Sequence, residues 1–204
     1  MNRLHRWYCQ SNQWKRKLDT EILPWSLDGV DLRGEVLELG PGPGLTTDWL
    51  SRHCDHITCL ELDPNAAHAL RERTSNGNVT VELGDASRMP FRDNLFAVVI
   101  SCTMLHHIPS SALQDRVFCE AFRVLKPEGL FVGTDSTWSL WMQLFHFADT
   151  MIILDPERLP ERLEVAGFVD VNVGIRSGRF KFCARRPKSL LSACDSRDVS
   201  LVQW

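Results

Sequence analysis

A glycine-rich turn is the first part of this sequence whose residue types and spacing indicate chemistry. The turn reads GPGPG, residues 40–44, and it follows the apolar run VLEL, which contains Glu38. Glycine is favoured where the backbone dihedral φ must be positive or where another molecule must approach the main chain closely. Main-chain amides at the start of the next segment would favour an anionic group on that molecule. The turn therefore predicts a ligand that lies against bare backbone.

Two more acidic residues follow later apolar runs, and their types indicate which ligand the turn would hold. Glu61 lies 21 residues beyond Gly40, a separation typical of an acid that accepts hydrogen bonds from ribose hydroxyls. Asp85 follows the next run and would accept from an exocyclic amine such as that of adenine. Three acids would repel a pyrophosphate, so the pattern favours a nucleoside that carries a positive charge. S-adenosylmethionine is such a molecule.

The elements that must position these residues follow from the hydrophobic pattern, in which short β-branched runs alternate with helical periodicity. The predicted strands are residues 36–39, 57–62, 79–83, 96–101, 130–134, 168–173 and 180–184. The predicted helices are residues 45–53, a helix capped by Asp63 that ends near residue 75, a helix from Ser110 or Ser111 that Pro127 stops, and residues 156–166. Alternation of this kind predicts a Rossmann-like, doubly wound α/β fold. We expect a mostly parallel seven-stranded sheet with an antiparallel C-terminal strand and helices on both faces, and ligands beyond the carboxyl ends of the strands.

Composition narrows the class of protein. The net charge of −3 argues against nucleic acid as a partner. The longest apolar-rich stretch, residues 138–154, is too short and too polar to span a bilayer. Seven cysteines without CxxC spacing predict reduced thiols, a cytoplasmic location and no metal site. We divide the chain into an N-terminal helical cap (1–33), a catalytic domain (34–186) and a C-terminal tail (187–204), which is part of the same unit or loosely ordered.

Four segments, in this order and spacing, resemble the class I S-adenosylmethionine-dependent methyltransferases. Within that family the chain looks most like the ubiquinone- and menaquinone-biosynthesis methyltransferases. The segments are VLELGPGPGLTTDWL (36–50), ITCLELDP (57–64), VELGDASRMPFRDNLFAVVISCTMLHHI (81–108) and AFRVLKPEGLFVGTD (121–135). The resemblance covers roughly residues 34–186 and implies S-adenosylmethionine as cofactor, with S-adenosylhomocysteine as product.

The resemblance also implies a set of cofactor-binding residues. They are Glu38, Gly40, Pro41, Gly42, Gly44, Glu61, Leu62, Asp85, Ala86 and Ser101. The glycine turn would line the methionine portion, and Glu38 would face its amino group, directly or through water. Glu61 would accept hydrogen bonds from both ribose hydroxyls, and Leu62 would lie beside the adenine. Asp85 and Ala86 would form hydrogen bonds with the edge of the adenine. Ser101 would touch the methionine end near the substrate.

Two histidines follow the fourth predicted strand, next to the expected position of the methyl group. A histidine there would take a proton from the acceptor as the methyl group arrives. His107 is our candidate catalytic base and His106 is a second one, although both also suit a packed loop and many methyl transfers need little base catalysis.

Aromatic segments supply weaker candidates. Tyr8 or Ser11 would contact cofactor or substrate if the N-terminal cap folds over the site, and plain hydrophobic packing is the alternative. Trp138 and Trp141 belong to an apolar segment, residues 136–155. That segment would cover the substrate, form an oligomer contact or join the core.

The function we expect is transfer of a methyl group from S-adenosylmethionine to a nucleophilic O, N, S or C atom by in-line displacement. The acceptor would be a small, partly apolar molecule. Two other classes stay open: an S-adenosylmethionine-binding protein without turnover, and a nicotinamide-dependent oxidoreductase on a similar fold. Both a monomer and a homodimer are compatible with the sequence.

Overall fold

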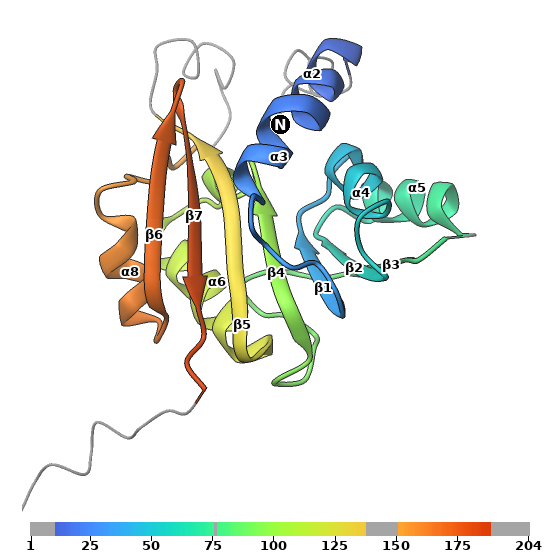
Figure 1. Cartoon of the computed structure of the whole chain (residues 1–204). Helices are drawn as coiled ribbons and strands as arrows, with labels where there is room; N and C mark the ends of the chain where they lie inside the picture. The colour runs from blue at the N-terminus through green and yellow to red at the C-terminus, as the bar shows by residue number, and fades with distance from the viewer. Residues whose placement is uncertain (1–10, 76, 138–150, 189–204) are drawn as a thin grey trace, which may run out of the picture.

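The computed structural model describes residues 11–75, 77–137 and 151–188, and Figure 1 shows a twisted sheet with helices packed against it. The chain begins with α2 (Asn12–Lys17), a π-helix η1 (Leu18–Ile22) and α3 (Leu23–Ser26). The strands are β1 (Glu35–Leu39), β2 (His56–Glu61), β3 (Val79–Leu83), β4 (Phe96–Cys102), β5 (Leu125–Ser136), β6 (Val169–Arg176) and β7 (Arg179–Arg185). The helices between them are α4 (Leu45–Leu50), α5 (Pro64–Thr74), the 3-10 turn η2 (Leu105–His107), α6 (Ser111–Val124) and α8 (Leu159–Val165).

The strand order across the sheet is β3-β2-β1-β4-β5-β7-β6. Neighbouring strands from β3 to β5 are parallel, whereas β7 runs antiparallel to both β5 and β6. The predicted doubly wound, mostly parallel seven-stranded sheet with an antiparallel C-terminal strand is therefore confirmed. Chain order reverses between β1 and β4, and sheets of this kind bind ligands beyond the carboxyl ends of the strands at such a reversal.

Side chains that alternate along each strand build two separate cores. Leu37 and Leu39 of β1 lie in the core on the side of α6 and α8. That core is rich in phenylalanine: Phe96, Phe118, Phe131, Phe168, Phe180 and Phe182. Val36 packs into the other core with Leu18 of η1 and with residues of α4 and α5. Helices thus cover both faces, and Glu38, in step with Val36, lies on the α4 side.

Four element boundaries differ from the prediction by three residues or more. The helix predicted over 45–53 ends at Leu50, and residues 51–53 form a turn. The strand predicted over 130–134 begins earlier, at Leu125, because α6 ends at Val124. Lys126, the residue before Pro127, is therefore already in the strand. Residues that precede a proline avoid helical backbone, which favours this early switch.

The helix predicted over 156–166 begins only at Leu159, and the strand predicted over 168–173 continues to Arg176. The other boundaries lie within two residues of the prediction. Asp63 is confirmed as the N-cap of α5, since its carboxylate accepts hydrogen bonds from the amides of Asn65 and Ala66. Strands β6 and β7 pair as the predicted antiparallel hairpin. In the part of the chain that the structure describes, no helix is both long and apolar enough to cross a membrane. The division of the chain at residues 33 and 186 stays a prediction.

Candidate functional site

The glycine turn lies beyond the carboxyl end of β1, at the reversal of strand order. All three of its glycines have positive φ, +61° for Gly40, +54° for Gly42 and +80° for Gly44. A Cβ atom on Gly42 would meet nothing within 4 Å, so the main chain there borders open space. The helix that follows, α4, has only six residues. The turn itself must therefore supply the surface that a ligand would lie against.

Glu61 joins this turn to the turn that follows β2. Its Oε2 accepts a hydrogen bond from the amide of Gly42 at 2.9 Å, and its Oε1 accepts from the amide of Asp63 at 2.9 Å. The residue is only 8% exposed. Each carboxylate oxygen can accept more than one hydrogen bond, so ribose hydroxyls can share these oxygens with the two amides.

Glu38 is buried on the α4 side, 1% exposed. Its Oε2 accepts from Thr47 Oγ1 at 2.6 Å and from Cys59 Sγ at 3.4 Å. Burial raises the pKa of Glu38 to about 7, against the opposing effect of these two hydrogen bonds. The predicted contact with the amino group of a cofactor stays a prediction, because the described partners of Glu38 are both protein side chains.

A pH-dependent stability follows from the raised pKa of Glu38. The folded protein holds this proton between the ordinary pKa of 4.5 and about 7, whereas the unfolded chain releases it. The stabilisation from this proton is therefore complete below about pH 4.5 and is lost as pH rises through 7. Over that range the free energy of unfolding of the wild type should fall by up to about 3 kcal/mol relative to that of Glu38→Gln. Urea unfolding at pH 4.5, 6 and 8 checks this. The exposed Glu82→Gln serves as control, and a pH-independent difference between wild type and Glu38→Gln would contradict it.

The residues predicted to contact adenine lie after β2 and β3. Asp85 is exposed, and its Oδ1 accepts from the amide of Ser87 at 2.8 Å. Leu62 is 68% exposed and Leu83 is 52% exposed. These side chains belong to adjacent strand ends, since Glu61 at the end of β2 pairs with Leu83. The Asp85 carboxylate suits the polar edge of a base, and the exposed apolar side chains suit its face. Ala86, next to Asp85 in the chain, is half-buried.

Ser101 occupies the carboxyl side of β4, in register with Leu39 of β1. It is 1% exposed, and its hydroxyl has no hydrogen-bond partner among the described residues. A buried hydroxyl without a partner is uncommon and indicates a water or ligand atom nearby. The role predicted for Ser101 at the methionine end of the cofactor stays a prediction.

Asp135, near the end of β5, is a residue that our sequence reasoning missed. Its Oδ1 lies 2.6 Å from His106 Nδ1, and its Oδ2 accepts from the main-chain amide of His106 at 3.2 Å. His106 is 3% exposed and Asp135 is fully buried. Burial would raise the pKa of the Asp135 carboxyl, but the charge and hydrogen bond of His106 outweigh it and the pKa lies below its ordinary value. The rule of collecting residues at strand ends could have found Asp135, since it follows a predicted strand directly.

The two histidines differ in environment. His106 is held by Asp135, and its carbonyl accepts from the amide of Ile152 at 3.0 Å. Gln114 of α6 fixes the same turn by donating to the carbonyl of Leu105 at 3.1 Å. His107 is half-buried, with its ring centroid 4.1 Å from that of His106. The structure thus assigns His106 to a buried contact and leaves His107 as the more accessible ring.

The weaker candidates are only partly within the described residues. Ser11 is the N-cap of α2, where its Oγ accepts from the amide of Trp14 at 3.1 Å. Its predicted contact with cofactor or substrate stays a prediction. Tyr8, Trp138 and Trp141 lie outside the described residues. The described residues contain no group of three or more His, Cys, Asp or Glu side chains that could hold a metal ion.

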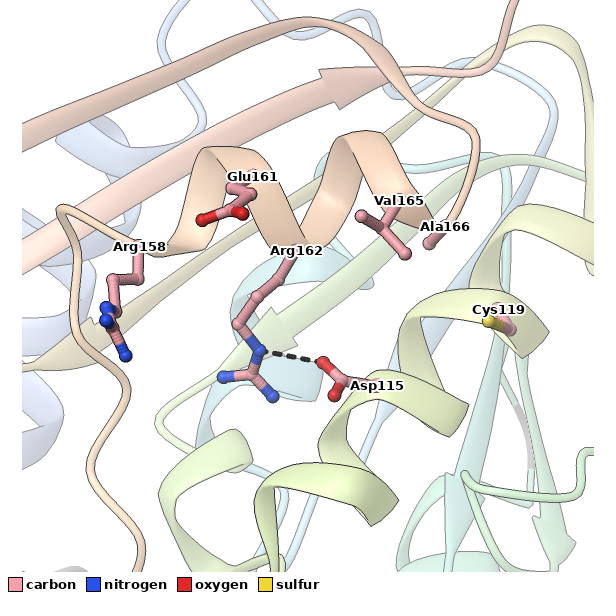
Figure 2. Close-up of a pocket in the computed structure, with 7 residues that line it drawn as sticks. All are labelled: Asp115, Cys119, Arg158, Glu161, Arg162, Val165 and Ala166. Carbon is pink, nitrogen blue, oxygen red and sulfur yellow. Dashed lines mark hydrogen bonds and ion pairs between the residues drawn. The ribbon is translucent and has the colours of Figure 1, made fainter.

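A pocket of about 420 Å³ lies elsewhere, between α6 and α8 (Figure 2). Its lining residues are Asp115, Cys119, Arg158, Glu161, Arg162, Val165 and Ala166. Arg162 Nε donates to Asp115 Oδ1 across it at 2.7 Å, so the ion pair closes part of the space. None of the predicted site residues contributes to this pocket, and it is not the site that the strand ends form.

Comparison with known proteins gives three consistent matches. Residues 37–133, a little under half of the chain, match the methyltransferase domain family. The demethylmenaquinone methyltransferase of Leptospira interrogans is 32% identical over 114 residues, 51% of this chain and 45% of that protein. The chloroplastic 2-methyl-6-phytyl-1,4-hydroquinone methyltransferase 2 of Oryza sativa is 30% identical over 186 residues, 89% and 51% of the two chains. The structure of Haemonchus contortus phosphoethanolamine N-methyltransferase 2 with S-adenosylmethionine has a TM-score of 0.72 at 18% identity, covering 90% of this chain and 56% of that one.

The sheet order defines a Rossmann-like α/β domain in which chain order reverses between β1 and β4. Taken with the matches, this order shows that residues 37–133 form a methyltransferase domain and that the fold of the chain is similar to that of a methyltransferase solved with S-adenosylmethionine. The chain spans about half the length of the curated relatives it matches.

Proposed function

We propose that this chain binds S-adenosylmethionine at the glycine turn and transfers its methyl group to a nucleophilic O, N, S or C atom of a small, partly apolar molecule. The observation that carries the proposal is the open space over Gly42 beside the Glu61 carboxylate. A side chain at position 42 would occupy part of that space, whereas bare backbone leaves it free for a ligand. The names of two relatives, which specify demethylmenaquinone and a phytyl hydroquinone, support a small acceptor with apolar character.

The residues present fit this cofactor in kind. Glu61 would accept from the ribose hydroxyls, Asp85 would accept from the adenine amine, and the Ser101 hydroxyl would meet the methionine end. When bound, S-adenosylmethionine supplies a methyl group activated by a sulfonium for in-line displacement. The contribution of the protein is then largely to hold the acceptor in line, because positioning supplies much of the rate gain in such reactions.

We assign two different tasks to the histidine pair. His106, held by Asp135 and by the amide of Ile152, positions the η2 turn beside the end of β4. His107, half-buried on the same turn, would accept the proton of the acceptor when its nucleophile carries one. The five described cysteines are free thiols, which agrees with a reducing, cytoplasmic location in this proposal.

Isothermal titration of the full chain with S-adenosylmethionine, S-adenosylhomocysteine and NAD tests the proposal. We expect both adenosyl compounds to bind and NAD not to bind. Binding of NAD without binding of S-adenosylmethionine would favour an oxidoreductase instead. A screen of phenols, hydroquinones, amines and thiols with radiolabelled methyl donor then follows, and binding without any transfer would favour a protein that lacks turnover.

Glu61→Ala is expected to weaken S-adenosylmethionine binding by about 1 to 3 kcal/mol, because charge-assisted hydrogen bonds to the ribose are lost. The same change releases the amides of Gly42 and Asp63, which loosens the turn. Titration calorimetry measures the effect, and Glu82→Ala on exposed β3 is the control. Equal affinities for Glu61→Ala and wild type would show that the ribose lies elsewhere.

A further inference from the structure

Arg179 opens β7 at the same edge of the sheet as the candidate site. It pairs with Ser136 at the end of β5, directly after Asp135. Its guanidinium lies 5.3 Å from the ring centroid of Trp14 of α2, and its Nη1 donates to Ser136 Oγ at 3.2 Å. In Figure 1 the start of β7 lies at the end of the sheet where β5 ends and α3 crosses. Arg179 therefore places a cation between the sheet edge and the N-terminal helices.

This cation has no carboxylate partner within ion-pair distance among residues 11–75, 77–137 and 151–188, and its Nε is buried without a hydrogen-bond partner there. Two other half-buried arginines differ: Arg123 pairs with Glu120, and Arg162 pairs with Asp115. A buried, charged donor that lacks an acceptor is costly, and its presence in a folded protein calls for an explanation.

The nearby acid Asp135 is not that acceptor, since no hydrogen bond or ion pair joins it to Arg179 among the described residues. Asp135 already accepts from His106 through both carboxylate oxygens and from the amide of Ser136 at 2.7 Å. The charge of Arg179 still reaches this region, because it helps to lower the pKa of Asp135. It also reaches Cys102 at the end of β4, where burial raises the pKa of the thiol to about 11 and Arg179 opposes that rise. Arg179 thus lies close to the ends of β4 and β5, where the proposed function requires the methyl acceptor.

On the basis of the function proposed above, we infer that Arg179 binds an acidic group of the methyl acceptor, a carboxylate or a phosphate. A guanidinium presents parallel N–H donors that match either group in a two-point contact. The aromatic face of Trp14 would hold the guanidinium plane in place, as stacking on a ring does for arginine.

The test measures binding of benzoate, phenyl phosphate and benzamide to the full chain saturated with S-adenosylhomocysteine, by titration calorimetry. Benzoate carries a carboxylate and phenyl phosphate carries a phosphate, so the two probes distinguish these acidic groups. Benzamide has a similar shape to benzoate but no charge, and it serves as the neutral control. We expect one or both anions to bind at least about tenfold more tightly than benzamide. Arg179→Met should remove that preference, and Arg179→Lys should weaken it, since lysine keeps the charge without the two-point geometry.

Lys126→Met is the matched control, because it removes one exposed positive charge at the opposite end of β5. It should leave the preference for anions unchanged. Equal binding of benzamide and both anions to the wild type, or no binding of any probe, would overturn the inference, as would an unchanged preference in Arg179→Met. If the wild type does not bind S-adenosylhomocysteine, the proposed function is overturned instead, so the two failures are distinguishable.

Discussion

Asp135→Ala is expected to destabilise the folded protein by about 3 to 5 kcal/mol, the range typical of removing one partner from a buried ion pair. The change leaves two donors of buried His106 and the amide of half-buried Ser136 without their acceptor. Urea unfolding at neutral pH measures the loss. Asp135→Asn, which keeps an acceptor oxygen without the charge, should lie between wild type and Asp135→Ala.

The control for this prediction is Asp115→Ala, which breaks the exposed pair with Arg162. Its effect should stay below about 1 kcal/mol. The pKa of Asp135 is lowered in the folded state from the ordinary 3.8, so its ionised form stabilises the protein above about pH 4. That stability is lost as pH falls through the folded pKa, and the gap between wild type and Asp135→Ala should shrink there. Equal effects of Asp135→Ala and Asp115→Ala at neutral pH would contradict a structural role for the pair.

Gly42→Val should abolish binding of S-adenosylmethionine while leaving a folded protein. A valine side chain would fill the open space beside Glu61, where nothing lies within 4 Å of a Cβ position. Because φ is +54° there, we also expect about 1 to 3 kcal/mol of backbone strain. Titration calorimetry on samples whose folding is verified by circular dichroism separates the two effects.

Gly34→Val provides the comparison for this variant. Gly34 also has positive φ, +87°, but it precedes β1 and so lies at the opposite edge of the sheet. Both variants should lose stability, whereas only Gly42→Val should lose cofactor binding. Near-native affinity in folded Gly42→Val would mean that the ligand does not lie against this turn.

The parts of the fold that could be predicted from the sequence depend on short-range signals. The glycine turn and the Asp63-Pro64 helix start are each encoded within a few neighbouring residues, and both have the predicted backbone conformation. The alternation of strands and helices is equally local, and it is sufficient to predict a parallel sheet. The same signals place Glu61 and Ser101 at strand ends before any contact is known.

The rest of the site depends on contacts between residues far apart in the chain. The pairing of His106 with Asp135 spans 29 residues, and that of Glu38 with Cys59 spans 21. Such pairs form only when strand register brings them together, and periodicity carries no information about them. Arg179 is a further case, because its position at the site depends on the antiparallel pairing of β7 with β5.

The double contact of Glu61 with the amides of Gly42 and Asp63 also bears on how the protein moves. The same carboxylate accepts hydrogen bonds from the turn between β1 and α4 and from the turn between β2 and α5. These two turns should therefore open together rather than independently. Hydrogen–deuterium exchange of the two amides should then be slow and matched in rate, and occupancy of the site should slow both by the same factor.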